Sequence, residues 1–369
     1  MSTPSSTEVI LHLSRSYPSL PTILSETENM ILPASDLNPA AGTGKAGFFS
    51  APISDGPYEL KSWGGGGTVV MVANPHYWGP AAVIPKVVFE TVPDYNARID
   101  ELRSGAVNMV NQIPPALISA MKGTPGISVE VSHYFGWIQL DMNDHASPLS
   151  NVNVRRAISL AVNRKQIVTD TLQGIVQPLA GFWPQSMHGY DPAISTTPNV
   201  AAAKKLLAGT PCAKSCQIQM YFETDDMPYS PQMAVIIQTD LAAIGINLQL
   251  VEVENSAMGQ YMSTGKYQMA LSNTNDFANI PDGLMLYGLQ PAGGANNSGY
   301  NSPVMNNLIA ETDAASGSQR AALLTKVDQQ FVRDLPWVPL SGGLDVWLTR
   351  VPVKAAWLDD AAIVQVAGK

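Results

Sequence analysis

The feature that most constrains the fold of this chain is a strand-like stretch that leads directly into a strongly amphipathic helix. Residues 134–143, YFGWIQLDMN, are rich in aromatic and aliphatic side chains, which is typical of a buried strand. A polar turn follows at residues 143–148. In residues 152–168, VNVRRAISLAVNRKQIV, apolar side chains recur every three or four positions, and the arginines and the lysine lie off that face. The sequence therefore predicts a strand–turn–helix unit of the kind from which α/β proteins are built.

The same alternation of strands and helices continues in the second half of the chain. Strand-like patterns occur at residues 217–222 and 246–253, and a helix predicted between them at 231–243 ends before Gly245. This order favours a largely parallel sheet that is covered by helices. With 369 residues the chain is too long for one average hydrophobic core, so we expect two lobes.

Several motifs resemble those of family 5 of the bacterial extracytoplasmic solute-binding proteins, which are the oligopeptide- and dipeptide-binding components of ABC importers. Residues 152–168 fit the family pattern V-R-x-A-[IL]-x-x-A-[IV]-[ND]-R-x-x-I-V. Further motifs occur in the order of the family: GPYEL at 56–60, NPHYWG at 74–79, VPDYNAR at 92–98 and NSGYNSP at 297–303. The resemblance covers about residues 8 to 357, although Asn108 stands where the family has an aspartate.

The resemblance implies a two-lobed α/β fold of the type II periplasmic-binding-protein class, with mixed sheets covered by helices. Lobe I is expected to comprise residues 1–135 and 338–369, and lobe II residues 136–337, with a hinge where the chain crosses between them. Members of the family begin with a further segment that carries the first strands of lobe I. We therefore expect lobe I to be incomplete at its N-terminus, either in a fragment or in a natural short homologue.

The resemblance also implies a binding protein and not an enzyme. It is expected to capture an oligopeptide by closure of the lobes and to deliver it to ABC permease subunits, as a monomer without a cofactor. The N-terminal residues MSTPSSTEVILHL lack the pattern of a signal peptide. The family resemblance alone therefore implies a place outside the cytoplasm, in the periplasm or as a cell-surface lipoprotein. Oligosaccharides or other small solutes are alternative ligands, and a hydrolase or a sensor on the same fold is the alternative of another class.

Composition and motifs agree with that expectation. The net charge of −9 disfavours nucleic acids and anionic membranes as partners, since both reward clustered lysine and arginine. The five histidines form no HExxH pair, there is no GxSxG motif, and we expect no metal site. The adjacent pairs Asp225-Asp226 and Asp359-Asp360 are interpreted as solvated loop charges, and the pair Asp141 and Asp144, which flanks the turn, is expected to cap the turn or the helix that follows it.

The strongest candidate for ligand binding is the polar stretch after the strand predicted at residues 267–271. Its candidate residues are Ser272, Asn273, Thr274, Asn275, Asp276 and Phe277. Open α/β sheets bind ligands beyond the carboxyl ends of their strands. In peptide-binding relatives the matching strand offers backbone hydrogen bonds to an extended ligand, and an aspartate at the position of Asp276 pairs with the ligand's α-amino group. The alternative is that Asp276 caps a local turn together with Asn279.

Aromatic side chains are candidates for the apolar walls of the site. Phe135 and Trp137 share one face of the predicted strand, and Trp183 lies in the loop GFWPQS. For each of them, packing in the core is the alternative. Residues 217–262 contain no lysine or arginine, so a fixed anchor for a ligand carboxylate is not expected there. This favours a longer peptide with a solvated end or a neutral oligosaccharide.

Two cysteines, Cys212 and Cys216, lie in the short stretch CAKSC. A disulfide between them would contribute roughly 2 kcal/mol by restricting the unfolded chain. The alternative is a pair of exposed thiols. A zinc site is not expected, because no second pair of cysteines or histidines lies nearby in sequence.

Overall fold

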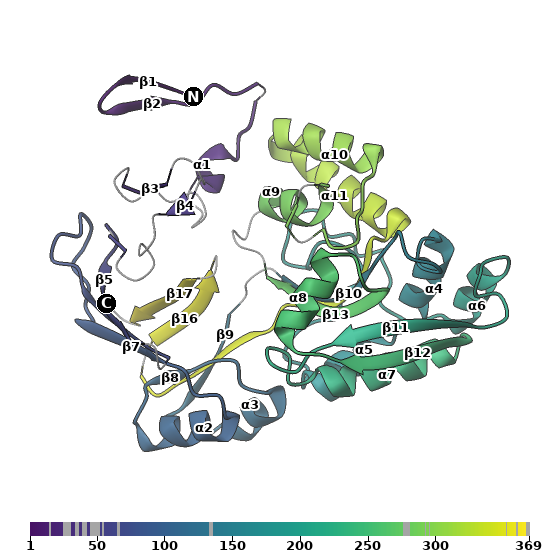
Figure 1. Cartoon of the computed structure of the whole chain (residues 1–369), viewed down its shortest axis with the longest axis horizontal. Coiled ribbons are helices and arrows are strands. Elements are labelled where there is room, and N and C mark those ends of the chain that lie inside the picture. The colour runs from purple at the N-terminus through teal and green to yellow at the C-terminus, as the bar shows by residue number, and fades with distance from the viewer. Residues whose placement is uncertain are drawn as a thin grey trace.

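The structure is a computed structural model of the chain. It describes residues 1–14, 16–24, 31–33, 37–38, 43–44, 52–53, 55–64, 67–132, 136–275, 281–291, 293–294, 296–351, 353–358 and 361–366. Figure 1 shows one large group of helices and strands and a second, more open group of smaller sheets. Within the described residues no helix combines the length and the apolar character that are needed to cross a membrane.

The large group is built on a five-stranded mixed sheet with the order β12-β11-β13-β10-β14. Its strands are β10 (Gly136–Met142), β11 (Cys216–Phe222), β12 (Ile246–Glu252), β13 (Met269–Asn275) and β14 (Trp337–Gly342). The strand β11 runs parallel to β12 and β13, whereas β10 runs antiparallel to β13 and β14. The strands predicted at 217–222 and 246–253 are confirmed, and the long predicted strand before the helix is β10.

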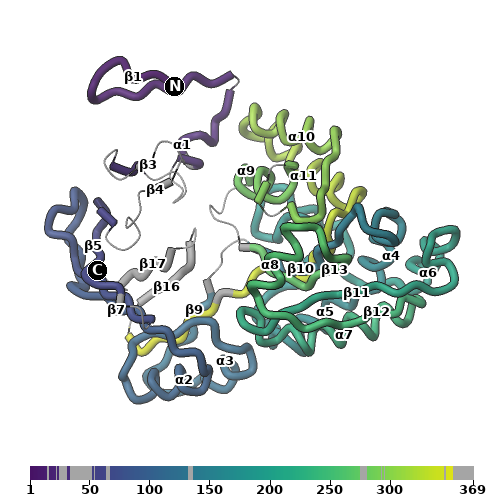
Figure 2. The backbone as a smooth tube through the Cα atoms, viewed as in Figure 1, coloured from purple at the N-terminus to yellow at the C-terminus, as the bar shows by residue number. Residues whose placement is uncertain are grey.

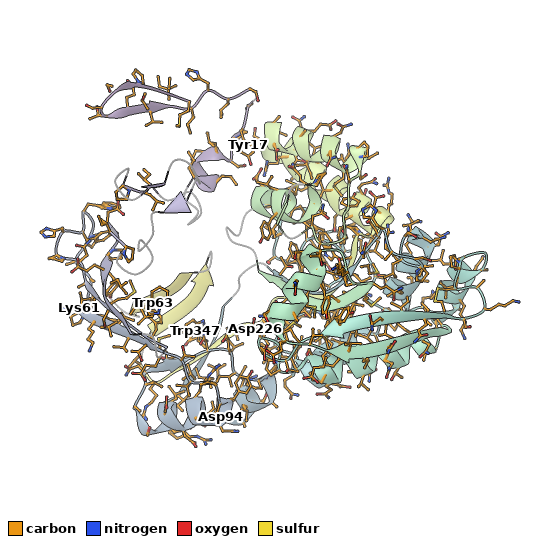
Figure 3. The ribbon with its side chains drawn as sticks, in the orientation of Figure 1. Tyr17, Lys61, Trp63, Asp94, Asp226 and Trp347 are labelled. Carbon is orange, nitrogen blue, oxygen red and sulfur yellow. A yellow bond between two sulfur atoms is a disulfide. The ribbon has the colours of Figure 1, made fainter. Side chains whose placement is uncertain are left out.

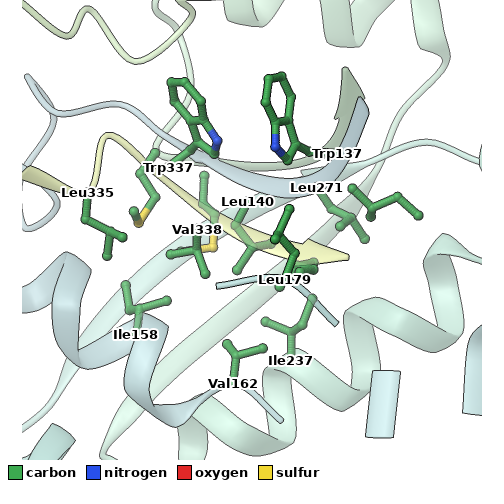
Figure 4. Close-up of a cluster of buried hydrophobic side chains, with 14 of the residues drawn as sticks. Trp137, Leu140, Ile158, Val162, Leu179, Ile237, Leu271, Leu335, Trp337 and Val338 are labelled. Atoms are coloured by element: carbon green, nitrogen blue, oxygen red, sulfur yellow. The ribbon is translucent and has the colours of Figure 1, made fainter. Parts of the chain in front are cut away.

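Helices cover both faces of this sheet, as Figure 1 shows. One face carries α4 (Val152–Ala161), α5 (Arg164–Thr171) and α7 (Ser230–Ala242), with α6 (Val200–Leu207) beside α4. The other face carries α8 (Asn255–Ser263), α9 (Pro281–Leu284), the π-helix η4 (Met285–Leu289), α10 (Pro303–Ala314) and α11 (Gly317–Asp334). Figure 4 shows the two layers of packing: Ile158 and Ile237 lie beneath the sheet, and Trp137 and Trp337 lie above it.

The helix predicted over residues 152–168 is two helices. Val162 has an extended backbone, with φ −66° and ψ 124°, and ends α4. The side chain of Asn163 then accepts a hydrogen bond from the backbone N–H of Gln166 and begins α5. Asparagine is a strong N-cap residue, so it starts a new helix where the apolar pattern alone predicts continuity.

The second group contains small antiparallel sheets. One has the order β8-β15-β9, formed by β8 (Met109–Val110), β9 (Ser128–Ser132) and β15 (Asp345–Thr349), next to α2 (Tyr95–Ser104) and α3 (Pro115–Met121). A second sheet has the order β5-β6-β7, formed by β5 (Tyr58–Gly64), β6 (Thr68–Ala73) and β7 (Lys86–Glu90). Shorter elements are the hairpins β1 (Ser2–Ser5)/β2 (Glu8–Ile10), β3 (Leu37–Asn38)/β4 (Thr43–Gly44) and β16 (Val353–Leu358)/β17 (Ala361–Val366), and the helix α1 (Leu20–Ile23).

The two groups have separate hydrophobic cores. The larger core takes all its buried members from residues 137–340, and the second takes its members from residues 99–121 and from Val346 and Leu348. We call residues 136–342 the large unit, and residues 95–132 with 345–349 the small unit. Leu344, on the connection between them, packs against both cores.

Two connections join the units, one from β9 to β10 and the other from β14 to β15. On either side of them the strands are paired, β9 with β15 and β10 with β14. The backbone N–H of Gly343 donates a hydrogen bond of 2.7 Å to the carbonyl oxygen of Gly136. Figure 2 shows the yellow segment that leads to β15 beside β9. The units are therefore joined by a narrow two-stranded ribbon.

Candidate functional site

One end of the five-stranded sheet, formed by the ends of its strands, faces the ribbon. The parallel strands β11, β12 and β13 have their carboxyl ends there, and Asn275, the last residue of β13, lies opposite Gly136, where β10 begins. Gly342, the last residue of β14, pairs with Trp137 of β10. Both connections to the small unit therefore leave the sheet at the carboxyl ends of its parallel strands, which is where an open α/β sheet binds its ligand.

The strand β13 contains most of the predicted ligand-binding stretch. It extends from Met269 to Asn275, four residues beyond the end of the strand predicted from sequence. Along its whole length it pairs with β10, but it pairs with β11 only at Met269 and Ala270. Among the described residues, the β11 side of the segment from Leu271 to Asn275 thus has no strand partner. This leaves an open strand edge in the middle of the sheet.

The side chains on this segment divide between solvent and a buried network. Asn273 is exposed. Ser272 donates a hydrogen bond to a carboxylate oxygen of Asp141, and Thr274 Oγ accepts one of 3.1 Å from the Gln139 amide. The backbone of Asn275 belongs to β13, whereas Asp276, Phe277 and Phe135 lie outside the described residues.

Next to β13, Gln139 and Asp141 form a buried polar pair on β10. Gln139 donates a hydrogen bond of 3.1 Å to Asp141 Oδ1, and its own Oε1 is buried without a partner among the described residues. Burial raises the pKa of Asp141 to about 6, although hydrogen bonds from Ser272 and Gln139 oppose the shift. The structure thus places Asp141 inside the sheet and not at the turn. Its alternation with Trp137 and Gln139 along a buried strand was the sequence signal for this position.

The two predicted aromatic contacts lie in the core of the large unit. Trp137 and Trp183 are 2% and 0% exposed. Their indole N–H groups donate hydrogen bonds of 2.8 Å to the backbone carbonyls of Phe182 and Leu324, respectively. Phe182 packs between them, with ring centroids 5.0 Å from Trp137 and 4.5 Å from Trp183. In this structure both residues therefore pack in the core, which is the alternative noted above, and neither has a free face at the edge of the sheet.

The loop after β11 adds negative charge to the same end of the sheet. Asp225 and Asp226 are exposed and Glu223 is buried. Asn255, at the start of α8, donates its backbone N–H to Asp225 (3.0 Å) and its side-chain amide to Asp226 (2.6 Å). Burial raises the pKa of Glu223, and the nearby Asp226 carboxylate acts in the same direction. The loop is therefore held in a fixed position and favours positively charged groups.

A hydrogen bond joins this loop to the small unit. The hydroxyl of Tyr95, the first residue of α2, donates 3.2 Å to the backbone carbonyl of Asp225. The guanidinium carbon of Arg98 lies 5.1 Å from the centre of the Tyr95 ring. Figure 3 labels Asp94, the N-cap of α2 in the small unit, and Asp226 in the large unit. The two units thus touch at the rim of the candidate site.

The cysteine pair lies at the opposite end of β11. Cys212 and Cys216 are bonded, with their Cα atoms 4.8 Å apart, and Cys216 is the first residue of the strand. Of the two alternatives left by the sequence, the structure contains the disulfide. It fixes the start of a strand that ends at the candidate site, and it takes no part in the site itself.

Comparison with known proteins gives one consistent result. The model of the bacterial extracellular solute-binding proteins, family 5 (middle region), matches residues 1–296. Di/tripeptide-binding protein 2 of Pseudomonas aeruginosa is 26% identical over 299 residues, which are 79% of this chain and 56% of the relative. The oligopeptide-binding protein OppA of Bacillus subtilis is 24% identical over 315 residues, or 80% of this chain and 57% of the relative. The chain thus spans about half the length of these curated relatives.

Solved structures show the same similarity in three dimensions. The periplasmic binding protein DppA from Helicobacter pylori, in complex with the peptide STSA, has a TM-score of 0.84 at 23% identity. The match covers 96% of this chain and 71% of that one. NikA from Staphylococcus aureus, in complex with Ni(L-His)2, has a TM-score of 0.79 at 17% identity and covers 94% of this chain and 73% of its own.

Proposed function

The chain belongs to family 5 of the bacterial extracellular solute-binding proteins, and from this premise we propose that it binds peptides in an extended conformation along β13. The match confirms the family resemblance that its motifs indicated. The structural likeness confirms the expected mixed α/β periplasmic-binding-protein fold. The family consists of binding proteins, so the site is one for capture and not for catalysis.

The observation that carries the proposal is the open edge of β13. A strand edge presents alternating N–H and C=O groups, and an extended peptide satisfies them by adding one strand to the sheet. The segment from Leu271 to Asn275 offers such an edge at the point where both connections to the small unit leave the sheet. Backbone pairing of this kind does not depend on which side chains the peptide carries, so it suits a protein that binds peptides of varied sequence.

The charge of the rim supports a peptide with a free amino end. Asp225 and Asp226 lie on the loop that follows β11, and residues 217–262 contain no lysine or arginine. A carboxylate close to an ammonium group stabilises it strongly where water is partly excluded. We propose that Asp276, which follows β13 directly, pairs with the ligand's amino group, as the family resemblance implies.

The relatives support peptides as the ligand class and define the alternative. The curated relatives from Pseudomonas and Bacillus are named for di-, tri- or oligopeptides. The solved structures include complexes with a peptide, with Ni(L-His)2 and with agropinic acid. Another small solute, including the oligosaccharide expected above, is therefore the alternative ligand.

We further propose that the two units are parts of two lobes that close on the ligand. Separate cores and a two-stranded ribbon permit rotation of one unit against the other. The ligand shifts the population toward the closed state by its higher affinity for that state. Delivery to ABC permease subunits by a monomer outside the cytoplasm completes the proposal.

The test is a thermal-shift titration with short peptides, oligosaccharides and peptides that are N-methylated along the backbone. At 100 times its dissociation constant, a ligand raises the free energy of unfolding by about 2.7 kcal/mol. We expect stabilisation by the unmodified peptides only, because N-methyl groups remove the donors that a strand edge requires. Asp276→Ala should weaken the effect, whereas Asp170→Ala, an exposed carboxylate on α5, should not. Stabilisation by sugars alone would overturn the proposal.

A further inference from the structure

A buried carboxylate lies directly beside β13, the strand on which the proposed peptide binds. Asp141 is 0% exposed and pairs across β10 and β13 with Ala270, one residue before the open segment begins. Ser272, within the open segment, donates its hydroxyl hydrogen to a carboxylate oxygen of Asp141. A single hydrogen bond therefore joins the charge of Asp141 to the strand that presents the open edge.

No positive charge is paired with this carboxylate. Within the described residues, the second donor to Asp141 is the neutral amide of Gln139, at 3.1 Å, and no lysine, arginine or histidine forms an ion pair with it. The strands on the two sides of β10 carry no ionisable side chain, since β13 reads MALSNTN and β14 reads WVPLSG. A buried carboxylate with two neutral donors and no counter-ion favours its protonated form, and burial raises the pKa of Asp141 to about 6.

The other ionisable groups of this region do not stabilise the charge of Asp141. Tyr267, just before β13, has a pKa raised far above neutrality and stays neutral. Asp144, after β10, and Glu223, after β11, are carboxyls whose own pKa values burial raises, and as like charges they oppose ionisation of Asp141.

The positive charges of the region have other partners or face solvent. Arg155 and His145 act on Asp144, and Lys266 is exposed. The helix α8 carries no charged side chain. The charged residues of α11 are exposed or bonded elsewhere: Lys326 and Arg333 are exposed, Arg320 is bonded to Asp282, Asp328 to the backbone of Phe182, and Asp334 to Tyr300. The pKa shift of Asp141 therefore arises from its burial, which the bonds from Ser272 and Gln139 only oppose.

Protonation of Asp141 changes what Ser272 offers to a ligand. An ionised Asp141 accepts the hydroxyl hydrogen of Ser272. A protonated Asp141 donates its own hydrogen to Ser272 Oγ instead, and the hydroxyl hydrogen of Ser272 becomes free for another acceptor. Ser272 is only half-buried, and neighbouring strands lie about 5 Å apart, so a ligand strand on the open edge is within reach of this hydroxyl.

We propose that peptide binding on β13 is linked to the uptake of a proton by Asp141, with Ser272 as the link between the proton and the ligand. This inference rests on the proposed function of β13. A bound strand removes water from Ser272 and Thr274, which are half-buried in the free chain, and so disfavours the ionised form of Asp141 further. The ligand's amino group does not cancel this effect. The far end of β13 lies five residues beyond Ala270, roughly 17 Å at the rise of a strand, which exceeds a Debye length.

Linkage gives the direction of the pH dependence. The pKa of Asp141 is about 6 in the free chain and higher in the complex, so affinity is highest below pH 6. Affinity falls as pH rises through the interval between the two pKa values and is constant above it. Because one pKa unit corresponds to a tenfold change in the dissociation constant, we expect binding to be about threefold to tenfold weaker at pH 7 than at pH 5.

The test is isothermal titration calorimetry of the full chain with trialanine and tetra-alanine at pH 5, 6 and 7. The termini of these peptides keep their charges over this range. We expect binding to weaken toward pH 7, and the heats at pH 6 to differ between buffers of different ionisation enthalpy, because a proton is taken up. Equal affinity at the three pH values, or heats that do not depend on the buffer, would overturn the linkage and leave the peptide proposal standing. No binding of either peptide at any pH would count against both.

Two variants identify the group that takes up the proton. Asp141→Asn is neutral at every pH, and its amide donates to Ser272 as the protonated carboxyl does. It should bind at pH 7 as tightly as the wild type binds at pH 5, a gain that loss of a merely structural residue would not produce. Asp240→Asn removes another partly buried carboxyl with a raised pKa, on α7 at the other face of the sheet, and should keep the pH profile of the wild type. A pH profile that persists in Asp141→Asn would assign the proton to another group, such as Glu223, and overturn the proposal.

Discussion

At the residue scale, Arg164 and Asp141 show two ways to bury a charge. Arg164 donates hydrogen bonds to the carbonyls of Leu179 and Pro339, at 2.8 and 2.7 Å, and to Ser159. Burial lowers the pKa of Arg164 to about 10, so it stays charged at neutral pH. Burial raises the pKa of Asp141 to about 6, so its charge changes near neutrality. The arginine is thus a permanent structural charge, whereas the carboxyl makes stability depend on pH.

We predict that Asp141→Asn stabilises the protein at pH 8. The pKa of Asp141 is about 6 in the folded chain against 3.8 ordinarily, so the folded state binds more protons between these values. The free energy of unfolding therefore falls as pH rises through this window and stays low above it. Asparagine avoids the buried charge, and the gain is at most about 3 kcal/mol. Urea unfolding at pH 4, 6 and 8 measures it, and the advantage should shrink towards pH 4.

A second buried carboxyl provides the control. Burial also raises the pKa of Asp328 to about 6, but its oxygens accept backbone N–H groups from Phe182 (2.5 Å) and Asp191 (3.2 Å). An asparagine there turns a donor toward one of these N–H groups, so Asp328→Asn should destabilise the protein at every pH. If Asp141→Asn were less stable than the wild type at pH 8, the buried charge would not be the unfavourable feature that we infer.

At the element scale, the disulfide determines how β11 begins. Cys212 is buried, and its backbone N–H donates 3.2 Å to the hydroxyl of Thr210, which in turn donates 2.7 Å to the carbonyl of Leu207 at the end of α6. Cys216 is the first residue of the strand. The bond therefore fixes the connection from helix to strand within a few residues, and the effect is local because the closed loop is short.

We predict a loss of roughly 2 kcal/mol in the free energy of unfolding for the double variant Cys212→Ala and Cys216→Ala, because the unfolded chain regains the freedom of a short loop. Urea unfolding of the wild type with and without a reductant should reproduce this difference. The variant itself should not respond to the reductant. A wild type that is equally stable in both conditions would mean that the bond does not form in solution.

At the scale of the whole molecule, the contact between Tyr95 and the loop after β11 bridges the two units. The covalent connection between the units is the ribbon, in which Gly343 is hydrogen-bonded to Gly136. The Tyr95 contact and the ribbon both lie at the carboxyl ends of the parallel strands of the large sheet. In the lobe closure proposed above, opening of the units has to break the Tyr95 hydrogen bond, whereas the ribbon is expected to persist in both states.

We predict that Tyr95→Phe shifts the ligand-free protein toward the open state. A net hydrogen bond of about 1 kcal/mol corresponds to a change of about fivefold in the ratio of closed to open molecules. Small-angle X-ray scattering should show a larger radius of gyration for this variant. Tyr261→Phe, which removes a hydroxyl within the large unit, is the control and should scatter like the wild type. An unchanged radius for Tyr95→Phe would show that the contact does not hold the units together.

The sequence by itself determined the types and order of the elements in the large unit. Local periodicity was sufficient for β11, α7 and β12, because each places one apolar face against the core. The same local reasoning failed at residues 162–163, where the cap of Asn163 divides one apolar pattern into two helices. The motifs also led to the correct family, since they record local turns and caps that recur together.

Only the tertiary structure decided which polar groups are buried and which strand edge is open. Arg164 lies off the apolar face of its helix, yet carbonyls from distant segments cover it. The edge of β13 is open because β11 ends at Phe222, one residue after its last pair with β13. Such features depend on contacts between residues that are far apart in sequence, and periodicity describes only near neighbours.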